Sequence, residues 1–156
     1  MPNWCYNSAT FVCPSKEIYD KLLQSIIDDN WFQTFTLENN QSESLRKPID
    51  IDIGNTDESK LTIDISFDTA WSPPLEMYMI MNNNYSIETT AFYYELGCEF
   101  FGRCIYSGSN EMDEPFDIPS NKEELIEIQK HISSELNEFM VPTWECLEEQ
   151  WIEEDY

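Results

Sequence analysis

Carboxylates are the residues of this 156-residue chain with the most obvious capacity for chemistry. Asp50, Asp52, Asp64 and Asp68 lie along two neighbouring stretches, on the side opposite the isoleucines. If the stretches pair as strands, cross-strand neighbours lie about 5 Å apart, and two or three carboxylates would hold Mg²⁺ or Ca²⁺. A metal-dependent hydrolase is therefore one hypothesis. The alternative is the solvent-exposed face of a sheet, and we predict that alternative, with no metal site and no cofactor.

Other catalytic patterns have little support. His131 is the one histidine, and it lies beside an apolar stripe but not on it, which predicts a solvated surface residue. The sequence has four glycines and no nucleophile-elbow, Walker-type or dinucleotide-binding motif. The acidic segment 110–117 lacks the glycine and glutamate spacing of a calcium-binding EF-hand loop. We therefore predict no catalytic residues and no enzymatic activity.

Aromatic residues at 93, 94, 100 and 101 raise the possibility of base stacking, as on RNA-binding sheets. That mode needs basic residues nearby, and only Arg103 is present, beside Glu95 and Glu99. Core packing is therefore the preferred interpretation for these four residues.

Net charge excludes more functions than it supports. The chain has 31 acidic and 8 basic residues, a formal charge of −23 and a pI of about 4.1. Such a surface repels phosphate backbones and anionic lipids and attracts basic proteins, so we expect neither direct nucleic-acid nor membrane binding. Residues 1–106 hold 16 acidic and 6 basic residues (net −10), whereas 107–156 hold 15 and 2 (net −13). The last third is thus the electrostatic focus.

The chain is nevertheless a folded protein, because 41% of its residues are hydrophobic and 14% aromatic. Its first seven residues have neither a basic nor an apolar signal region, which predicts a location in the host cytoplasm. There the cysteines are expected to be reduced and to serve as core residues. These are Cys5, Cys13, Cys98, Cys104 and Cys146.

Hydrophobic periodicity predicts the elements of residues 1–106. Ser15 is a candidate N-cap for the first helix. Ser72 is a candidate N-cap for the second helix, with Trp71 packed beneath it, and Asn82–Asn84 end that helix. The predicted elements are a strand over 3–13, a helix over 16–29, a hairpin with strands 49–53 and 61–67, a helix over 75–81, and a hairpin with strands 85–95 and 98–106. Residues 31–37 are apolar but unassigned, and 38–44 form a polar loop.

Residues 107–156 read as a loop over 107–119 followed by helices. Ser120 and Glu123 form a capping pattern for a helix that Pro142 ends. Its apolar stripe is Leu125, Ile128, Ile132, Leu136 and Phe139. A short acidic helix then covers 144–156. The stripe is expected to dock residues 120–156 on the body and to turn Glu123, Glu124, Glu127, Glu135 and Glu138 toward solvent.

The element order predicts an α+β fold: a ferredoxin-like antiparallel sheet (βαββαβ plus an extra strand) with a C-terminal acidic helical extension. We expect residues 1–106 to form the ferredoxin-like domain and 107–156 to dock on it, giving a single structural domain overall.

Three segments carry a family resemblance. They are Met-Pro-Asn-Trp-Cys-Tyr-Asn at residues 1–7, Phe-Asp-Thr-Ala-Trp-Ser-Pro-Pro at 67–74, and Tyr-Tyr-Glu-Leu-Gly-Cys-Glu-Phe-Phe-Gly at 93–102. Together they resemble the Api-like family of phage, prophage and plasmid proteins, over residues 1 to about 106. The resemblance implies a ferredoxin-like domain and a viral or mobile-element origin, and it implies no activity.

The function we expect is that of a non-enzymatic acidic binding protein. Its carboxylates would stand in for phosphates on the basic surface of a host nucleic-acid-handling or defence protein, so it would be an anti-defence DNA mimic. The predicted binding residues are Glu145, Glu148, Glu149, Glu153 and Glu154, with Trp144 and Trp151 as aromatic anchors and Tyr156 beside them. A structural or regulatory module with a peptide or self partner remains a third hypothesis.

Overall fold

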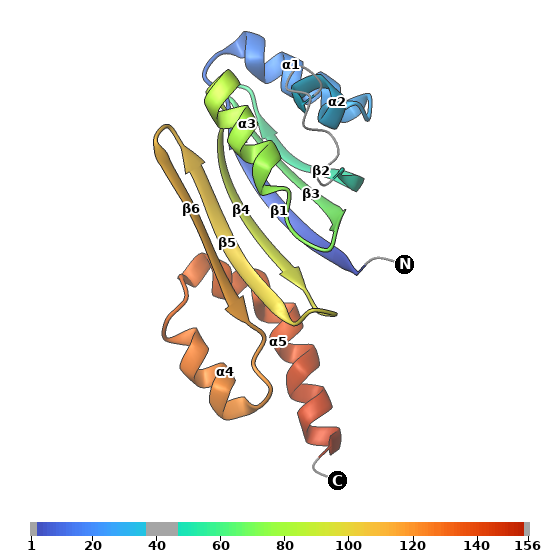
Figure 1. Ribbon diagram of the computed structural model, residues 1–156, viewed down its shortest axis with the longest axis vertical. Coiled ribbons are helices and arrows are strands. Elements are labelled where there is room, and N and C mark those ends of the chain that lie inside the picture. Colours follow the sequence, from blue (N-terminus) through green and yellow to red (C-terminus); the bar gives the residue numbers. More distant parts are fainter. Residues whose placement is uncertain (1–2, 37–46, 155–156) are drawn as a thin grey trace. The chain divides into compact units, whose positions relative to one another are not determined.

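The computed structural model describes residues 3–36 and 47–154. The chain divides into two compact units, unit 1 (residues 1–115) and unit 2 (residues 116–156). The elements in chain order are β1 (Trp4–Val12), α1 (Lys16–Ile27), α2 (Trp31–Thr36), β2 (Ile49–Asp57), β3 (Thr62–Ala70), α3 (Leu75–Tyr85), β4 (Glu88–Glu95), β5 (Phe100–Ser107), β6 (Asn110–Asp117), α4 (Lys122–Gln129) and α5 (Ser134–Glu154) (Figure 1).

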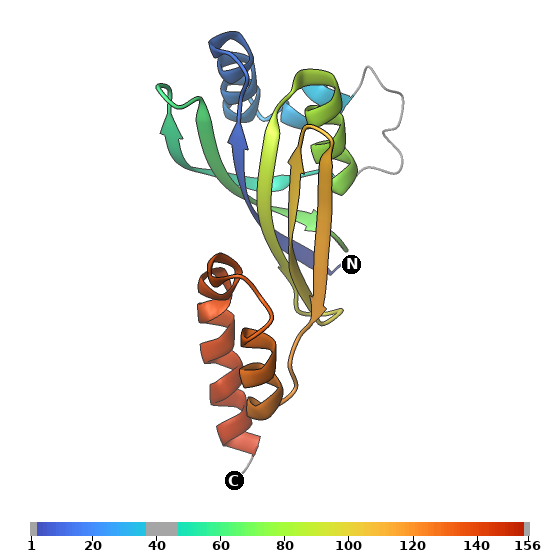
Figure 2. The ribbon, with the colours of Figure 1, turned by 90° about the vertical axis from the view of Figure 1, so that its left-hand side faces the viewer.

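Unit 1 is built on a six-stranded antiparallel sheet with the strand order β2-β3-β1-β4-β5-β6. Its first four strands, in the order β2-β3-β1-β4, form the ferredoxin-like arrangement that the βαββαβ element order predicted. The sheet twists from β6 to β2, as Figure 2 shows. The predicted fold class is therefore confirmed, although β5 and β6 extend the sheet by two strands rather than one.

The sixth strand is a correction, because residues 107–119 were predicted to be a loop. β6 is acidic, contains Pro115 and has few of the residues that favour strands. A proline is tolerated on an edge strand, whose outer backbone groups need no partner in the sheet. The hairpin from β5 turns at Gly108, whose φ of +60° suits glycine. Residues 110–117 therefore form a strand because their backbone pairs with β5, and this pairing produces no hydrophobic alternation in the sequence that would predict it.

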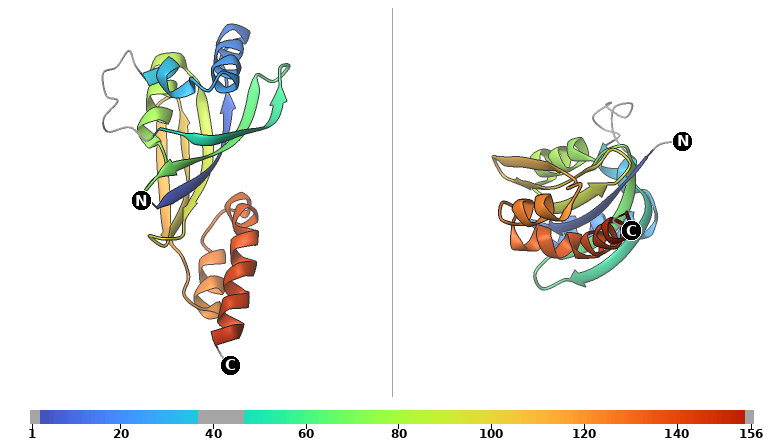
Figure 3. Two further views of the ribbon diagram at one scale, coloured as in Figure 1. Left: turned by 90° about the vertical axis from the view of Figure 1, so that its right-hand side faces the viewer. Right: turned by 90° about the horizontal axis from the view of Figure 1, so that it is seen from below.

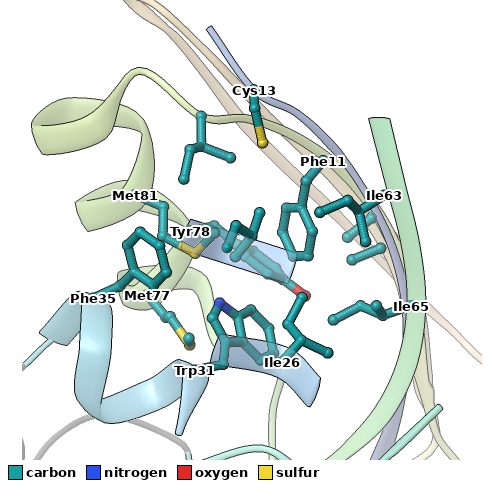
Figure 4. Close-up of a cluster of buried hydrophobic side chains, with 14 of the residues drawn as sticks. Phe11, Cys13, Ile26, Trp31, Phe35, Ile63, Ile65, Met77, Tyr78 and Met81 are labelled. Atoms are coloured by element: carbon teal, nitrogen blue, oxygen red, sulfur yellow. The ribbon is translucent and has the colours of Figure 1, made fainter. Parts of the chain in front are cut away.

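The core of unit 1 lies between one face of the sheet and the three helices α1, α2 and α3 (Figure 4). Trp31 of α2 is 1% exposed and makes edge contacts with Phe11 at 5.5 Å and Phe67 at 5.2 Å between ring centroids. Tyr78 of α3 lies 6.2 Å from Phe11. The strand side chains of this cluster all point to the face that α1, α2 and α3 cover, so none of them lies on the opposite face of the sheet.

Helix α1 forms where the sequence predicted it, and α2 forms in a segment for which no element was predicted. Ser15 caps α1, and its hydroxyl accepts a hydrogen bond of 3.2 Å from the backbone N–H of Ile18. The unassigned apolar segment forms α2, from Trp31 to Thr36. The predicted polar loop at 38–44 lies outside the described residues.

The first hairpin is present, but its two strands differ in burial. In β3, Ile63 and Ile65 are buried and alternate with half-buried residues, as predicted. In β2 the register shifts twice against β3, and Ile53 is 41% exposed. The predicted alternation holds for Ile49 and Ile51, which are half-buried, and Ile51 packs against the core. It fails at Ile53, because bulges on this edge strand break the period of two.

The second helix begins at Leu75 as predicted, but its cap differs from the prediction and it ends later. Pro74 occupies the N-cap of α3, and Ser72 does not cap it. The helix also continues through the three asparagines to Tyr85, where the left-handed residue Ser86 ends it. Asn82 is 6% exposed, and its side chain binds the backbone of Gly108 at 2.8 and 3.0 Å. This long-range pair satisfies a polar group that would otherwise favour helix termination.

Unit 2 consists of α4 and α5, which pack against each other (Figure 3). The prediction of one helix up to Pro142 is wrong, since α4 ends at Gln129 and α5 begins at Ser134. The hydroxyl of Ser133 accepts a hydrogen bond from the N–H of Leu136 at 3.1 Å, which favours this new start. Pro142 lies inside α5 rather than ending it.

The N-terminus of α4 is displaced by one residue from the predicted capping pattern. Asn121 is the N-cap, and its side chain accepts from the N–H of Glu124 at 2.9 Å. Glu124 in turn accepts from the N–H and hydroxyl of Ser120, both at 2.8 Å. The N-cap is therefore Asn121 instead of Ser120, and the glutamate that accepts hydrogen bonds from Ser120 is Glu124 instead of Glu123.

The prediction that the cysteines are core residues is confirmed at three of the five positions. Cys5, Cys13 and Cys104 are buried free thiols, whereas Cys98 and Cys146 are exposed, so the core prediction is wrong for those two. Burial, with a smaller effect of Glu95, raises the pKa of Cys5 to about 12. Across residues 3–36 and 47–154, each helix is too short or too polar to span a bilayer.

Candidate functional site

The four aspartates of the hydrolase hypothesis are not brought together. Asp68 faces Ile49 of β2, and the negative charge of Asp50, after burial, contributes to raising its pKa. Asp64 accepts a hydrogen bond of 2.7 Å from the hydroxyl of Thr10 on β1 instead. Within the described residues no group of three or more His, Cys, Asp or Glu side chains is placed to hold a metal ion. The bulges in β2 separate carboxylates that a regular register would have aligned.

The acidic segment 110–117 is strand β6 of the sheet, and two of its side chains bind neighbouring strands. The hydroxyl of Tyr93 donates to the carboxylate of Asp113 at 2.5 Å, and burial raises the pKa of Tyr93 far above its usual range. Glu114 forms an ion pair of 2.6 Å with Arg103 of β5. These contacts tie β6 to β4 and β5, so the two side chains serve the sheet rather than a calcium loop.

His131 is a solvated residue, as predicted. Its side chain is 64% exposed, and its Nε2 lies 3.1 Å from a carboxylate oxygen of Glu127. Hydrogen bonds from His131 and Lys130 lower the pKa of Glu127. The pair is an exposed contact between residues one turn apart.

Two of the four aromatics considered for base stacking are buried. Tyr93 is 1% exposed and Phe101 is fully buried. Tyr93 also meets Phe100 edge-on at 6.0 Å between ring centroids, and Tyr94 contacts Tyr6 in a tilted arrangement with centroids 5.3 Å apart. The packing interpretation is therefore confirmed for Tyr93 and Phe101.

The predicted acidic tail forms the greater part of α5. This helix contains seven glutamates and no basic residue. From Glu135 to Glu154 it rises about 28 Å at 1.5 Å per residue, which is about one carboxylate per 4–5 Å. One DNA strand carries a charge per 3.4 Å of axis, so the two linear charge densities are similar.

Five of these glutamates share one side of α5. At 100° per residue their directions fall within about 80° of one another, opposite the buried Leu136 and Met140. All five are exposed. We name them the acidic stripe: Glu135, Glu138, Glu145, Glu149 and Glu153. Three of them, Glu145, Glu149 and Glu153, belong to the predicted binding set. Glu135 was not in that set, although its separation of 18 residues from Glu153, which is five full helical turns, indicates that both lie on the same side of the helix.

The remaining predicted binding residues lie elsewhere. Glu148 pairs with Lys122 of α4 at 2.7 Å. Glu154 and Trp151 line an open groove of about 420 Å³ beside the start of α4. Trp144 is 3% exposed, and its indole N–H donates to the side chain of Asn137 at 3.0 Å. The expectation of Trp144 as an exposed anchor is therefore wrong, whereas Tyr156 lies outside the described residues.

Comparison with known proteins places the chain in a family. The family model described as "Ferredoxin-like domain in Api92-like protein" matches residues 50–134, more than half of the chain. The chain belongs to this family. The match agrees with the strand order of unit 1 and with the resemblance of segments 67–74 and 93–102. Searches of curated proteins and of solved structures found no match.

Proposed function

We propose that this Api92-like protein is a non-enzymatic acidic binding protein of a virus or mobile element. Its partner would be a host nucleic-acid-handling or defence protein whose basic surface normally meets phosphates. The acidic stripe supports this proposal most directly, because it presents five exposed carboxylates on one side of a helix that has no basic residue. The family membership adds support through the phage and plasmid setting of the family.

Charge distribution supports unit 2 as the binding element. Residues 116–156 hold twelve acidic and two basic residues, a net charge of −10 over 41 residues. Residues 1–115 hold nineteen and six, a net charge of −13 over nearly three times the length. Fields from such a cluster accelerate encounter with a basic surface and weaken with salt.

A charge-matched pair of variants tests the proposal. The stripe variant replaces Glu145, Glu149 and Glu153 with Lys. The control replaces three exposed glutamates of unit 1, Glu17, Glu99 and Glu111, with Lys. Each variant changes the formal charge by six, from −23 to −17.

Host proteins are captured on the immobilised wild type and eluted with duplex DNA. The proposal is supported by a host protein that duplex DNA displaces from the wild type. The control variant should capture this protein as well as the wild type does, and the stripe variant should capture at least tenfold less of it. Equal loss on both variants would show that net charge alone acts. Capture that duplex DNA fails to displace would contradict phosphate mimicry.

A further inference from the structure

A second surface lies in unit 1, at the end of the sheet where β1 begins. Trp4, Trp71 and Leu96 are 45%, 44% and 50% exposed there. Trp4 pairs with Ala70, the last residue of β3, and Leu96 directly follows β4, the other neighbour of β1. Figure 1 shows the start of β1 and the ends of β3 and β4 at this same end. Three exposed large apolar residues therefore lie at neighbouring backbone positions at this end of the sheet.

Trp71 contradicts the expectation that it packs beneath α3. Its φ of +70° lies in the left-handed region, which is unusual for a bulky residue. Its backbone N–H donates to the carbonyl of Asn3 at 2.7 Å, and the N–H of Ser72 donates to that of Ala70 at 2.9 Å. These bonds keep Trp71 in the turn between β3 and α3, where its indole is partly exposed.

Buried polar groups hold this turn from inside. The amide of Asn7, which is fully buried, donates to the hydroxyl of Thr69 at 2.9 Å and to the carbonyl of Cys5 at 3.0 Å. The hydroxyl of Thr69 donates to the carbonyl of Ser72 at 2.7 Å. A connected chain of hydrogen bonds thus runs from β1 to the turn. Because each member is buried or half-buried, the position of Trp71 is fixed before any partner arrives.

Negative charge lies next to the exposed indoles. Asp68 is two residues before Ala70 on the same face of β3, so it is a diagonal neighbour of Trp4, about 7–8 Å away. Asp50 lies close enough to Asp68 for its charge to act on it. Within residues 3–36 and 47–154, neither carboxylate forms an ion pair with Lys, Arg or His. The site therefore combines aromatic side chains with carboxylates that no cation of the described residues neutralises.

We propose that this end of the sheet, the Trp4–Trp71 site, binds an arginine side chain of a basic protein segment. The guanidinium group stacks on an exposed indole and donates hydrogen bonds toward Asp68, while Leu96 contacts the apolar part of the segment. Arginine fits better than lysine because its planar group stacks and binds a carboxylate through two N–H groups at once. The residues that define this site all belong to unit 1, so the proposal goes beyond the proposed function of the acidic stripe.

The test is an NMR titration of the indole N–H signals of the labelled full-length protein. Trp4 and Trp71 signals are assigned with Trp4→Phe and Trp71→Phe. The probes are two blocked five-residue peptides that alternate glycine with arginine or glycine with lysine. We expect the arginine peptide to shift the Trp4 and Trp71 signals with at least threefold lower Kd than the lysine peptide.

Two matched substitutions locate the binding. Asp68→Asn is expected to raise the Kd of the arginine peptide at least threefold. Asp64→Asn, on the same face of β3 but bonded to Thr10, should leave it within twofold. The stripe variant should also leave this Kd unchanged, which separates the site from the proposed function.

Several results would overturn the proposal. These are equal affinity for the two peptides, equal effects of Asp68→Asn and Asp64→Asn, or shifts confined to tryptophans other than 4 and 71. Shifts of the Trp4 and Trp71 signals that depend on protein concentration alone would instead assign the surface to a second copy of this chain. The wild-type shifts decide the matter even if a variant fails to fold.

Discussion

Unit 1 and unit 2 divide core packing and charge between them. Among the described residues, the main hydrophobic cluster has eighteen members, and all of them lie in unit 1, between Ala9 and Tyr106. Unit 2 has five buried apolar side chains among its described residues, Pro119, Leu125, Leu136, Met140 and Trp144. It carries more than twice the negative charge per residue. The large core therefore fixes a scaffold, whereas the short acidic helices present charge at a cost in self-repulsion.

The largest expected effect concerns the core of unit 1. Replacing Trp31 with Ala removes its contacts with Phe11 and Phe67 and should lower the free energy of unfolding by about 3–5 kcal/mol. Urea titration followed by circular dichroism measures it. Trp31→Phe keeps one aromatic ring and leaves a smaller cavity, and the indole N–H that it removes has no hydrogen-bond partner among the described residues, so its cost should be clearly smaller. Equal costs would mean that this core tolerates a cavity.

A second prediction concerns the sheet of unit 1 at Gly102. A Cβ added there would overlap the carbonyl oxygen of Glu114 and lie 2.6 Å from the hydroxyl of Tyr93. Gly102→Ala should therefore cost about 1–3 kcal/mol, because β6 or Tyr93 must move. Gly54→Ala is the control, since its nearest neighbour is 3.4 Å away. Thermal unfolding that is the same for both variants would contradict the close packing of β6.

A third prediction stabilises unit 2. Pro142 cannot donate the backbone hydrogen bond that an interior helical residue makes, and its ring crowds the preceding turn. Pro142→Ala should raise the free energy of unfolding by about 1–2 kcal/mol, less than the full helix penalty because the unfolded chain also gains freedom. Helicity and the thermal midpoint should both increase. A lower midpoint would indicate that α5 depends on a bend at this proline.

The smallest expected effect is a titration in unit 2. Hydrogen bonds from the N–H and hydroxyl of Ser120 lower the pKa of Glu124 below its ordinary value of 4.5. The capping contribution should therefore be complete above that pH and be lost as the pH falls through the lower folded value. Carbon-detected NMR of the carboxyl group measures the pKa. Ser120→Ala keeps the N–H and should raise it only part of the way, so an unchanged pKa would exclude the hydroxyl contact.

Local patterns were sufficient wherever a feature depends on neighbours in sequence. The alternation of Ile63, Ile65 and Phe67 gave the buried face of β3, and Ser15 gave the start of α1. Those signals are local because burial period and capping each involve residues within one or two turns. The docking of residues 120–156 on unit 1, the host cytoplasm and the absence of a catalytic role stay predictions.

By itself the sequence determined the ferredoxin-like strand order, the two hairpins and the concentration of acidic residues in the last third. Tertiary structure decided β6, which pairs through its backbone, and the length of α3, which Asn82 secures by bonding Gly108. It also placed Trp71 at the surface and Trp144 in the interior. The physical reason is that periodicity reports which face of an element is apolar, whereas these outcomes depend on hydrogen bonds and contacts between residues distant in the chain.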